Sequence, residues 1–200
     1  MYNSFGFSNP LVDEDTLRKM TRTLAHRGPD DNGIFIKNNV GLGHTRLSIL
    51  DLSSEGHQPM KSVDGSVTLI YNGELYNYQV LKKNLIEKGR SFRSNTDTEV
   101  VAAAFELWGT KSFSRFNGQF AIAVLDLKTR KLFLVRDRIG IVPIFYFVQP
   151  GVLAFGSEIK ALKQISHTSF APNEEQLAAR IGLPYKLHAS GNNTLYEGVK

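Results

Sequence analysis

An apolar run near the middle of the chain constrains its fold more than any other segment. Residues 119–126 read Gln-Phe-Ala-Ile-Ala-Val-Leu-Asp, with polar residues only at the two ends. A strand that is apolar at consecutive positions, rather than at alternate ones, is usually covered on both of its faces. The sequence therefore predicts a strand at the centre of a layered domain.

The other apolar runs are short and mostly follow one another in pairs. Residues 33–37 and 40–50 are predicted to form one hairpin, and residues 143–148 and 152–155 a second. Helical patterns are grouped in pairs between the strands and do not follow each strand in turn. We therefore expect an α+β fold, a four-layer αββα sandwich of two mainly antiparallel sheets with helices outside.

A strand-like run over residues 67–70 leads directly into Asn72-Gly73 and then into a helical pattern that stops at Gly89. One interpretation is a plain turn, because Asn-Gly is a common turn signal. The other is chemical. The Gly73 N–H and the Asn72 side-chain amide could together hold a developing oxyanion.

Two charged residues also allow both a structural and a functional interpretation. Arg46 lies in the otherwise apolar second arm of the first hairpin, either on an exposed face or as a bidentate clamp for a carboxylate. Asp97 follows Thr96 in a capping box with Glu99. It could simply favour the helix dipole, or it could receive a substrate ammonium group.

Composition excludes several classes of protein. Hydrophobic residues make up 42% of the 200 residues and charged residues 22%, which is typical of a globular protein. The chain has no cysteine, so disulfides, thiolate metal sites and a thiol nucleophile are excluded. The net charge of +5 is scattered, and the five histidines do not fall at metal-ligand spacings, so we expect neither nucleic-acid nor metal binding. No apolar run is long enough to span a membrane, and we expect a cytoplasmic protein.

Seven segments, in this order, resemble the N-terminal glutaminase domain of glutamine-hydrolysing asparagine synthetases. This is a class II glutamine amidotransferase domain with the N-terminal-nucleophile (Ntn) hydrolase fold. The segments are His26-Arg27-Gly28-Pro29-Asp30, residues 43–49 (Gly-His-Thr-Arg-Leu-Ser-Ile), residues 71–78 (Tyr-Asn-Gly-Glu-Leu-Tyr-Asn-Tyr), residues 97–100, residues 116–120, Arg136-Asp137-Arg138 and residues 157–162.

The resemblance implies a role for each matching position. Arg46 would bind the α-carboxylate of glutamine, and Asn72 and Gly73 would form the oxyanion hole. Glu74 and Asp97 would receive the α-ammonium group. The residues expected to back the pocket are Leu47, Ile49 and Leu50.

The start of the chain departs from the family pattern. The family begins Met-Cys-Gly-Ile, and the Cys, exposed by removal of Met, is the nucleophile. This chain begins Met1-Tyr2-Asn3-Ser4. Tyr2 therefore stands at the nucleophile position, and a phenol with a pKa of about 10 is a poor substitute for a thiol with a pKa of about 8.5. We expect hydrolysis by this chain to be impaired or absent.

Three explanations of the missing cysteine stay open. The domain could bind glutamine without hydrolysing it and serve a synthetase that uses free ammonia. The first residues could be altered relative to an active parent. The chain could also belong to a branch with an inert amidotransferase domain, such as the ring-closing synthetases.

The resemblance also implies a division of the chain and its partners. Residues 1–165 are expected to form the amidotransferase domain, and residues 166–200 a linker or the start of an ATP-dependent synthetase domain. No cofactor is expected in this chain, and ATP and Mg²⁺ would bind only in the synthetase domain. The expected partners are glutamine, that synthetase domain in the same or a separate chain, and a second copy in a homodimer.

Overall fold

The fold is described from a computed structural model that covers residues 12–49, 51–165, 168, 170–182 and 193–200. Its main sheet is antiparallel with the strand order β3-β4-β5-β6. These strands span Met60–Lys61, Val67–Leu75, Gly118–Asp126 and Lys131–Arg136. The predicted central strand is thus β5, and it lies between β4 and β6.

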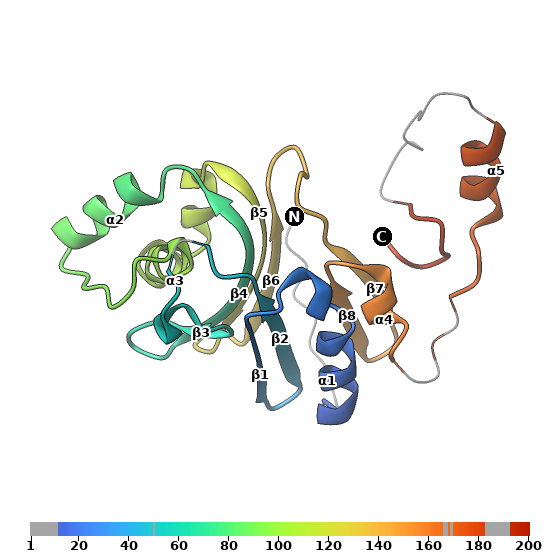
Figure 1. Ribbon diagram of the computed structural model, residues 1–200, viewed down its shortest axis with the longest axis horizontal. Helices are drawn as coiled ribbons and strands as arrows, with labels where there is room; N and C mark the ends of the chain where they lie inside the picture. The colour runs from blue at the N-terminus through green and yellow to red at the C-terminus, as the bar shows by residue number, and fades with distance from the viewer. Residues whose placement is uncertain (1–11, 50, 166–167, 169, 183–192) are drawn as a thin grey trace.

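Two antiparallel hairpins form the second β layer in the described part of the chain. One joins β1 (Asp31–Lys37) to β2 (Val40–Arg46), and the other joins β7 (Phe145–Gln149) to β8 (Val152–Gly156). Figure 1 shows these hairpins on one side of the main sheet and two helices on the other.

The helices form the two outer layers. Against the main sheet lie α2 (Tyr78–Glu87) and α3 (Asp97–Trp108), whereas α1 (Glu14–Arg22) and α4 (Ile159–Leu162) cover the hairpins (Figure 1). A further helix, α5 (Glu174–Gly182), stands apart from these layers. Three short 3-10 helices also lie in the described part of the chain, η1 (Ala25–Arg27), η2 (Ser54–Gly56) and η3 (Gly109–Arg115). The order helix, sheet, hairpins, helix confirms the expected αββα layering.

Apolar contacts on both faces of β5 hold the layers together. Phe120, Ile122 and Val124 pack into the core beneath α2 and α3. Ala123 and Leu125 point the other way and pack with Leu42 of β2. Because successive strand residues alternate between faces, one uninterrupted apolar strand serves two cores at once.

The helices begin as their sequences dictate. The Asp13 carboxylate accepts a hydrogen bond from the Thr16 N–H and caps α1. The Thr96 hydroxyl caps α3 by accepting from the Glu99 N–H, but the Glu99 carboxylate instead accepts from the N–H groups of Arg93 and Ser94. The predicted capping box is therefore only half formed.

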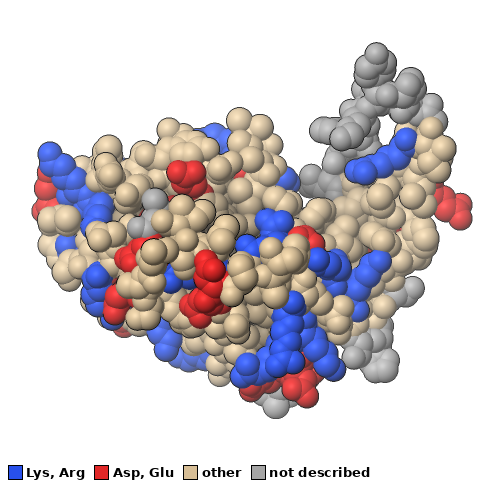
Figure 2. Space-filling view, in the orientation of Figure 1, with Lys and Arg blue, Asp and Glu red and all other residues tan. Residues whose placement is uncertain are grey.

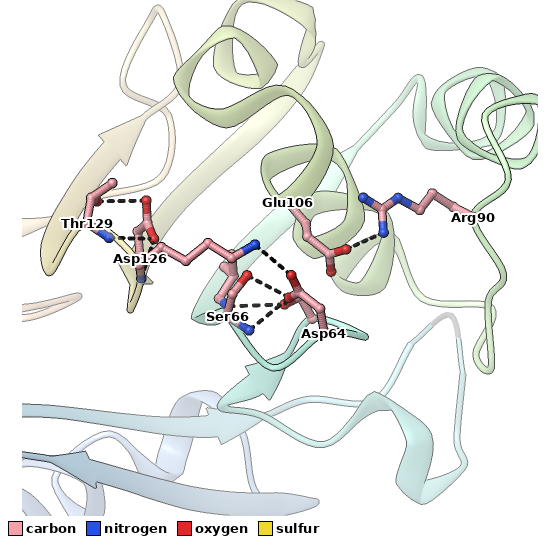
Figure 3. A network of polar contacts seen from close by, with 9 residues as sticks. Asp64, Ser66, Arg90, Glu106, Asp126 and Thr129 are labelled. Carbon is pink, nitrogen blue, oxygen red and sulfur yellow. Dashed lines mark hydrogen bonds and ion pairs between the residues drawn. The ribbon is translucent and has the colours of Figure 1, made fainter.

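Polar contacts join two turns at the end of the main sheet where β4 begins. Asp64, just before β4, accepts hydrogen bonds from Ser66 and forms an ion pair of 2.8 Å with Lys128 in the turn after β5 (Figure 3). Asp126 accepts from Thr129 within that second turn, and nearby Glu106 of α3 pairs with Arg90. The ion pair ties the β3–β4 turn to the β5–β6 turn.

The last described residues return to the second layer. The N–H of Tyr146 in β7 donates to the Lys200 carbonyl, and the Lys200 N–H donates back to Tyr146, at 2.8 and 2.9 Å. Val199 is buried in the same core as Phe147. The domain boundary at residue 165 stays a prediction. Among the described helices, none has both the length and the apolar character needed to cross a membrane.

The interpretation of Asn72-Gly73 as a turn is wrong, because β4 continues through both residues to Leu75 and pairs with β5 along its whole length. Gly73 makes this continuation feasible. Its φ is +148°, and a Cβ there would lie 2.1 Å from the carbonyl oxygen of Gln119. Only glycine adopts such a conformation at so close an approach without strain.

We predict that Gly73→Ala lowers the free energy of unfolding by about 2 kcal/mol or more, because it adds both backbone strain and a steric clash. Urea unfolding at pH 7 measures this change. Gly156→Ala is the matched control, since its added methyl would make an ordinary contact of 3.5 Å with Ala161. If both substitutions lower the free energy of unfolding by the same amount, the conclusion that residue 73 must be glycine is wrong.

Candidate functional site

A cavity of about 1320 Å³ opens among α1 and strands β2, β4, β5 and β8. Its volume is ample for a small polar substrate. The cavity brings together most of the residues that the sequence singled out. They are Arg46, Leu47, Ile49, Asn72, Gly73, Glu74 and Asp97. Tyr2 and Leu50 lie outside the described residues.

Arg46, the last residue of β2, provides a buried positive charge in the cavity wall. Its side chain donates hydrogen bonds to the carbonyls of Ser53, at 2.8 Å, and of Asp51. The guanidinium lies directly on Gly56, where a Cβ would be 2.0 Å from Arg46 Nη2. Two of its five N–H donors are therefore used by the loop, and the other three have no hydrogen-bond partner among the described residues. The second arm of the hairpin ends here and not at residue 50, because the loop wraps around this side chain.

The loop after β2 carries two of the predicted pocket residues. Asp30 fixes the start of this loop by accepting a hydrogen bond of 2.7 Å from the Ser48 N–H. Leu47 and Ile49 line the cavity, but they are 56% and 76% exposed. They lie at its rim, where a bound ligand would cover them.

Asp97, the first residue of α3, provides the opposite charge. It is buried, and its Oδ2 accepts hydrogen bonds from the Tyr71 hydroxyl at 2.7 Å and from the Leu75 N–H at 3.0 Å. Burial raises the pKa of this carboxyl, while these two hydrogen bonds act in the opposite direction. Glu74, the other predicted ammonium acceptor, is exposed at the cavity edge.

Asn72 and Gly73 lie side by side in β4 and line the same cavity. Phe120, opposite Gly73, uses its own backbone groups on Asp137: its N–H donates to Asp137 Oδ2, and its carbonyl accepts from the Asp137 N–H. In an antiparallel sheet, the N–H and C=O groups of one residue point to the same side of its strand. A residue that uses both groups on one neighbouring segment therefore forms no backbone hydrogen bond with the residue opposite it on the other side. The Gly73 N–H is thus outside the β4–β5 ladder, as an oxyanion donor must be.

Sequence reasoning missed two residues that border this site, Gln58 and His44, which both contact the backbone of Tyr71. The Gln58 side-chain amide donates to the Tyr71 carbonyl at 3.1 Å, and the Tyr71 N–H donates to Gln58 Oε1 at 2.7 Å. His44 Nε2 lies 3.2 Å from the same carbonyl. No local pattern around Gln58 indicates this contact, because Gln58 and Tyr71 are 13 positions apart in the sequence.

His44 has a defined tautomer and an unused acceptor. A carbonyl can only accept, so Nε2 carries the proton and Nδ1 is left with a lone pair. Nδ1 is buried and has no hydrogen-bond partner among the described residues. Burial lowers the pKa of His44 from 6.5 to about 4, so the ring is neutral at physiological pH.

The described residues contain no group of three or more His, Cys, Asp or Glu side chains arranged to hold a metal ion. On the face shown in Figure 2, Lys and Arg are interspersed with Asp and Glu. That face does not have the continuous basic band that a nucleic-acid surface presents.

Comparisons with known proteins identify the family to which the chain belongs. A family model described as a glutamine amidotransferase domain matches residues 1–200. The chain is 42% identical to asparagine synthetase 3 (glutamine-hydrolyzing) of Bacillus subtilis over 97% of its length, and 38% identical to a putative asparagine synthetase 2 (glutamine-hydrolyzing) of Methanocaldococcus jannaschii over 80%. It covers 32% and 34% of these relatives, so it spans about a third of their length.

A solved structure of glutamine phosphoribosylpyrophosphate amidotransferase from B. subtilis matches 64% of this chain and 30% of that chain, with a TM-score of 0.55 and 24% identity. At this identity the likeness concerns the fold alone. It confirms the Ntn-hydrolase type of αββα sandwich expected from the sequence.

We predict that the free energy of unfolding decreases by about 3 kcal/mol through His44 alone as the pH falls from 6.5 to 4. In this window the unfolded chain binds a proton at residue 44 that the folded chain excludes. His44→Gln retains an N–H for the Tyr71 carbonyl but cannot titrate. For each protein, the free energy of unfolding is measured with urea at each pH and compared with its own value at pH 8. Between pH 6.5 and 4 it should therefore decrease less for the variant. The same decrease in both proteins would refute the assignment.

Proposed function

Because the chain belongs to the glutamine amidotransferase domain family, we propose that its cavity binds glutamine. The α-carboxylate pairs with the free donors of Arg46, and the α-ammonium group with Asp97. The side-chain amide then lies toward Asn72 and Gly73. The observation that carries this proposal is one cavity walled by a buried cation and a buried anion, which are the two charges that a zwitterionic amino acid needs.

Hydrolysis of the amide needs a nucleophile as well as a binding site. Attack on the amide carbonyl produces a tetrahedral oxyanion, and in this proposal the Gly73 N–H and the Asn72 side-chain amide stabilise it. Departure of ammonia leaves an acyl group on the nucleophile, and water releases this group as glutamate. The donors for the oxyanion are present in this chain, and the family's thiol is not.

The residue at the family's nucleophile position is Tyr2, and the 200 residues contain no cysteine. We infer that the domain holds glutamine but hydrolyses it poorly or not at all. A non-hydrolysing glutamine-binding or scaffold domain of an ammonia-using or ring-closing synthetase is the second candidate, and the missing cysteine is the observation that favours it.

The relatives' greater length supports a partner for this domain. We propose an ATP-dependent synthetase domain, in the same or a separate chain, that uses ammonia to make asparagine or a related amide. ATP and Mg²⁺ would bind in that domain, and no cofactor would bind in this one. A homodimer in the cytoplasm is part of the same proposal.

We predict that Arg46→Ala abolishes glutamine binding measured by isothermal titration calorimetry, because the α-carboxylate loses its bidentate partner. Arg18→Ala is the matched control, since Arg18 is exposed on α1 and pairs with Glu14 in the same helix. If Arg46→Ala binds glutamine with unchanged affinity, Arg46 does not bind the α-carboxylate.

We predict that Tyr2→Cys restores glutamate release from glutamine once Met1 is removed, because the other site residues are present. Intact mass spectrometry establishes whether Met1 has been removed from this variant, and a coupled glutamate assay measures the activity. The unaltered chain should release no more glutamate than a buffer blank. A variant that has lost Met1 and still releases no glutamate would mean that the cavity is not competent for hydrolysis.

A further inference from the structure

Two groups of β4 hold the carboxylate of Asp97 through the same oxygen. The hydrogen bonds from the Tyr71 hydroxyl and the Leu75 N–H both end on Oδ2. Oδ1 receives no side-chain hydrogen bond from any described residue, and Asp97 lines the cavity. Oδ2 is thus anchored by β4, whereas Oδ1 accepts no hydrogen bond from β4 and belongs to a side chain that lines the cavity.

Tyr71 is itself fixed at both ends. Its backbone N–H and carbonyl are paired with the Gln58 side chain, which takes the place of a neighbouring strand beyond the short β3. Tyr71 is only 4% exposed, and its ring belongs to the core beneath α3. The hydroxyl therefore reaches Asp97 from a side chain that has little freedom to move.

The chemical state of the pair is also defined. Burial and the nearby Asp97 charge raise the pKa of Tyr71 far above its ordinary value, so the phenol keeps its proton and is the donor. Burial raises the pKa of Asp97, and the hydrogen bond from Tyr71 lowers it. The hydroxyl thus helps a buried carboxylate to stay ionised.

We propose that the Tyr71 hydroxyl is a positioning group that makes the site selective for ligands with an α-ammonium group. By holding Oδ2, it orients Oδ1 toward the cavity and keeps the negative charge that pairs with the ammonium. This inference rests on the proposed glutamine site and adds to it a residue outside the family-derived set of binding residues.

A merely structural role would give a different result from a positioning role. If Tyr71 only supports the core, its hydroxyl should affect all ligands of the cavity equally. If it acts through Asp97, its loss should weaken only those ligands that carry the α-ammonium group. The pair of ligands that separates these cases is glutamine and 4-carbamoylbutanoate, which is glutamine with hydrogen in place of the α-amine.

The test is calorimetric titration of the 200-residue chain and its Tyr71→Phe variant with both ligands at pH 7.5. We expect the variant to bind glutamine about tenfold more weakly, because a hydrogen bond to a charged group is lost. Its affinity for 4-carbamoylbutanoate should change by less than about twofold, because this ligand has no ammonium group to interact with Asp97. Tyr76→Phe, in an exposed tyrosine just beyond β4, is the matched control and should leave both affinities unchanged.

A second variant keeps the test decisive if Tyr71→Phe perturbs the core. In an Asp97→Asn background, Tyr71→Phe should cause no further loss of glutamine affinity, because the carboxylate through which it acts is gone. Equal losses for both ligands, no loss for either, or additive losses in the double variant would overturn the proposal. Failure of the unaltered chain to bind glutamine would overturn the proposed function itself, and the inference with it.

Discussion

Both faces of β5 are buried, and this burial determines how the surrounding layers are arranged. Alternate side chains of this strand pack beneath α2 and α3 and against the β1–β2 hairpin. A strand with no polar face needs two apolar partners, so it requires both a helical layer and a second β layer. The cavity lies where these β layers do not fully close, with β4 and β2 in its wall.

This layering also explains why the polar site is built from both sides of β4. Tyr71 faces α3 and meets Asp97, whereas neighbouring Ile70 packs toward the hairpin. A buried carboxylate is costly unless it is hydrogen-bonded, and Tyr71 and Leu75 meet that need on one oxygen. Arg46 is stabilised in the same way by the carbonyls of its own loop. Among the described residues, each of these two buried charges thus has polar partners in the protein, and the proposed ligand would add further ones.

The sequence predicted the features that depend on local patterns. The apolar run of β5, the first hairpin, formed by β1 and β2, and the Thr96 cap of α3 are all present. The interpretation of Asn72-Gly73 as a turn is wrong, since pairing with β5 overrides the turn preference of this dipeptide. The contacts of Tyr71 with Gln58 and Asp97 join residues 13 and 26 positions apart, and no local pattern reveals them.

A crystal structure of the chain grown with glutamine would show whether the cavity is a glutamine site. We expect intact glutamine in the cavity, with its α-carboxylate on Arg46 and its α-ammonium on Asp97 Oδ1. Its side-chain carbonyl should point toward the Gly73 N–H. Glutamine bound elsewhere, bound with its charged groups away from Arg46 and Asp97, or converted to glutamate would mean that these residues do not form the proposed site.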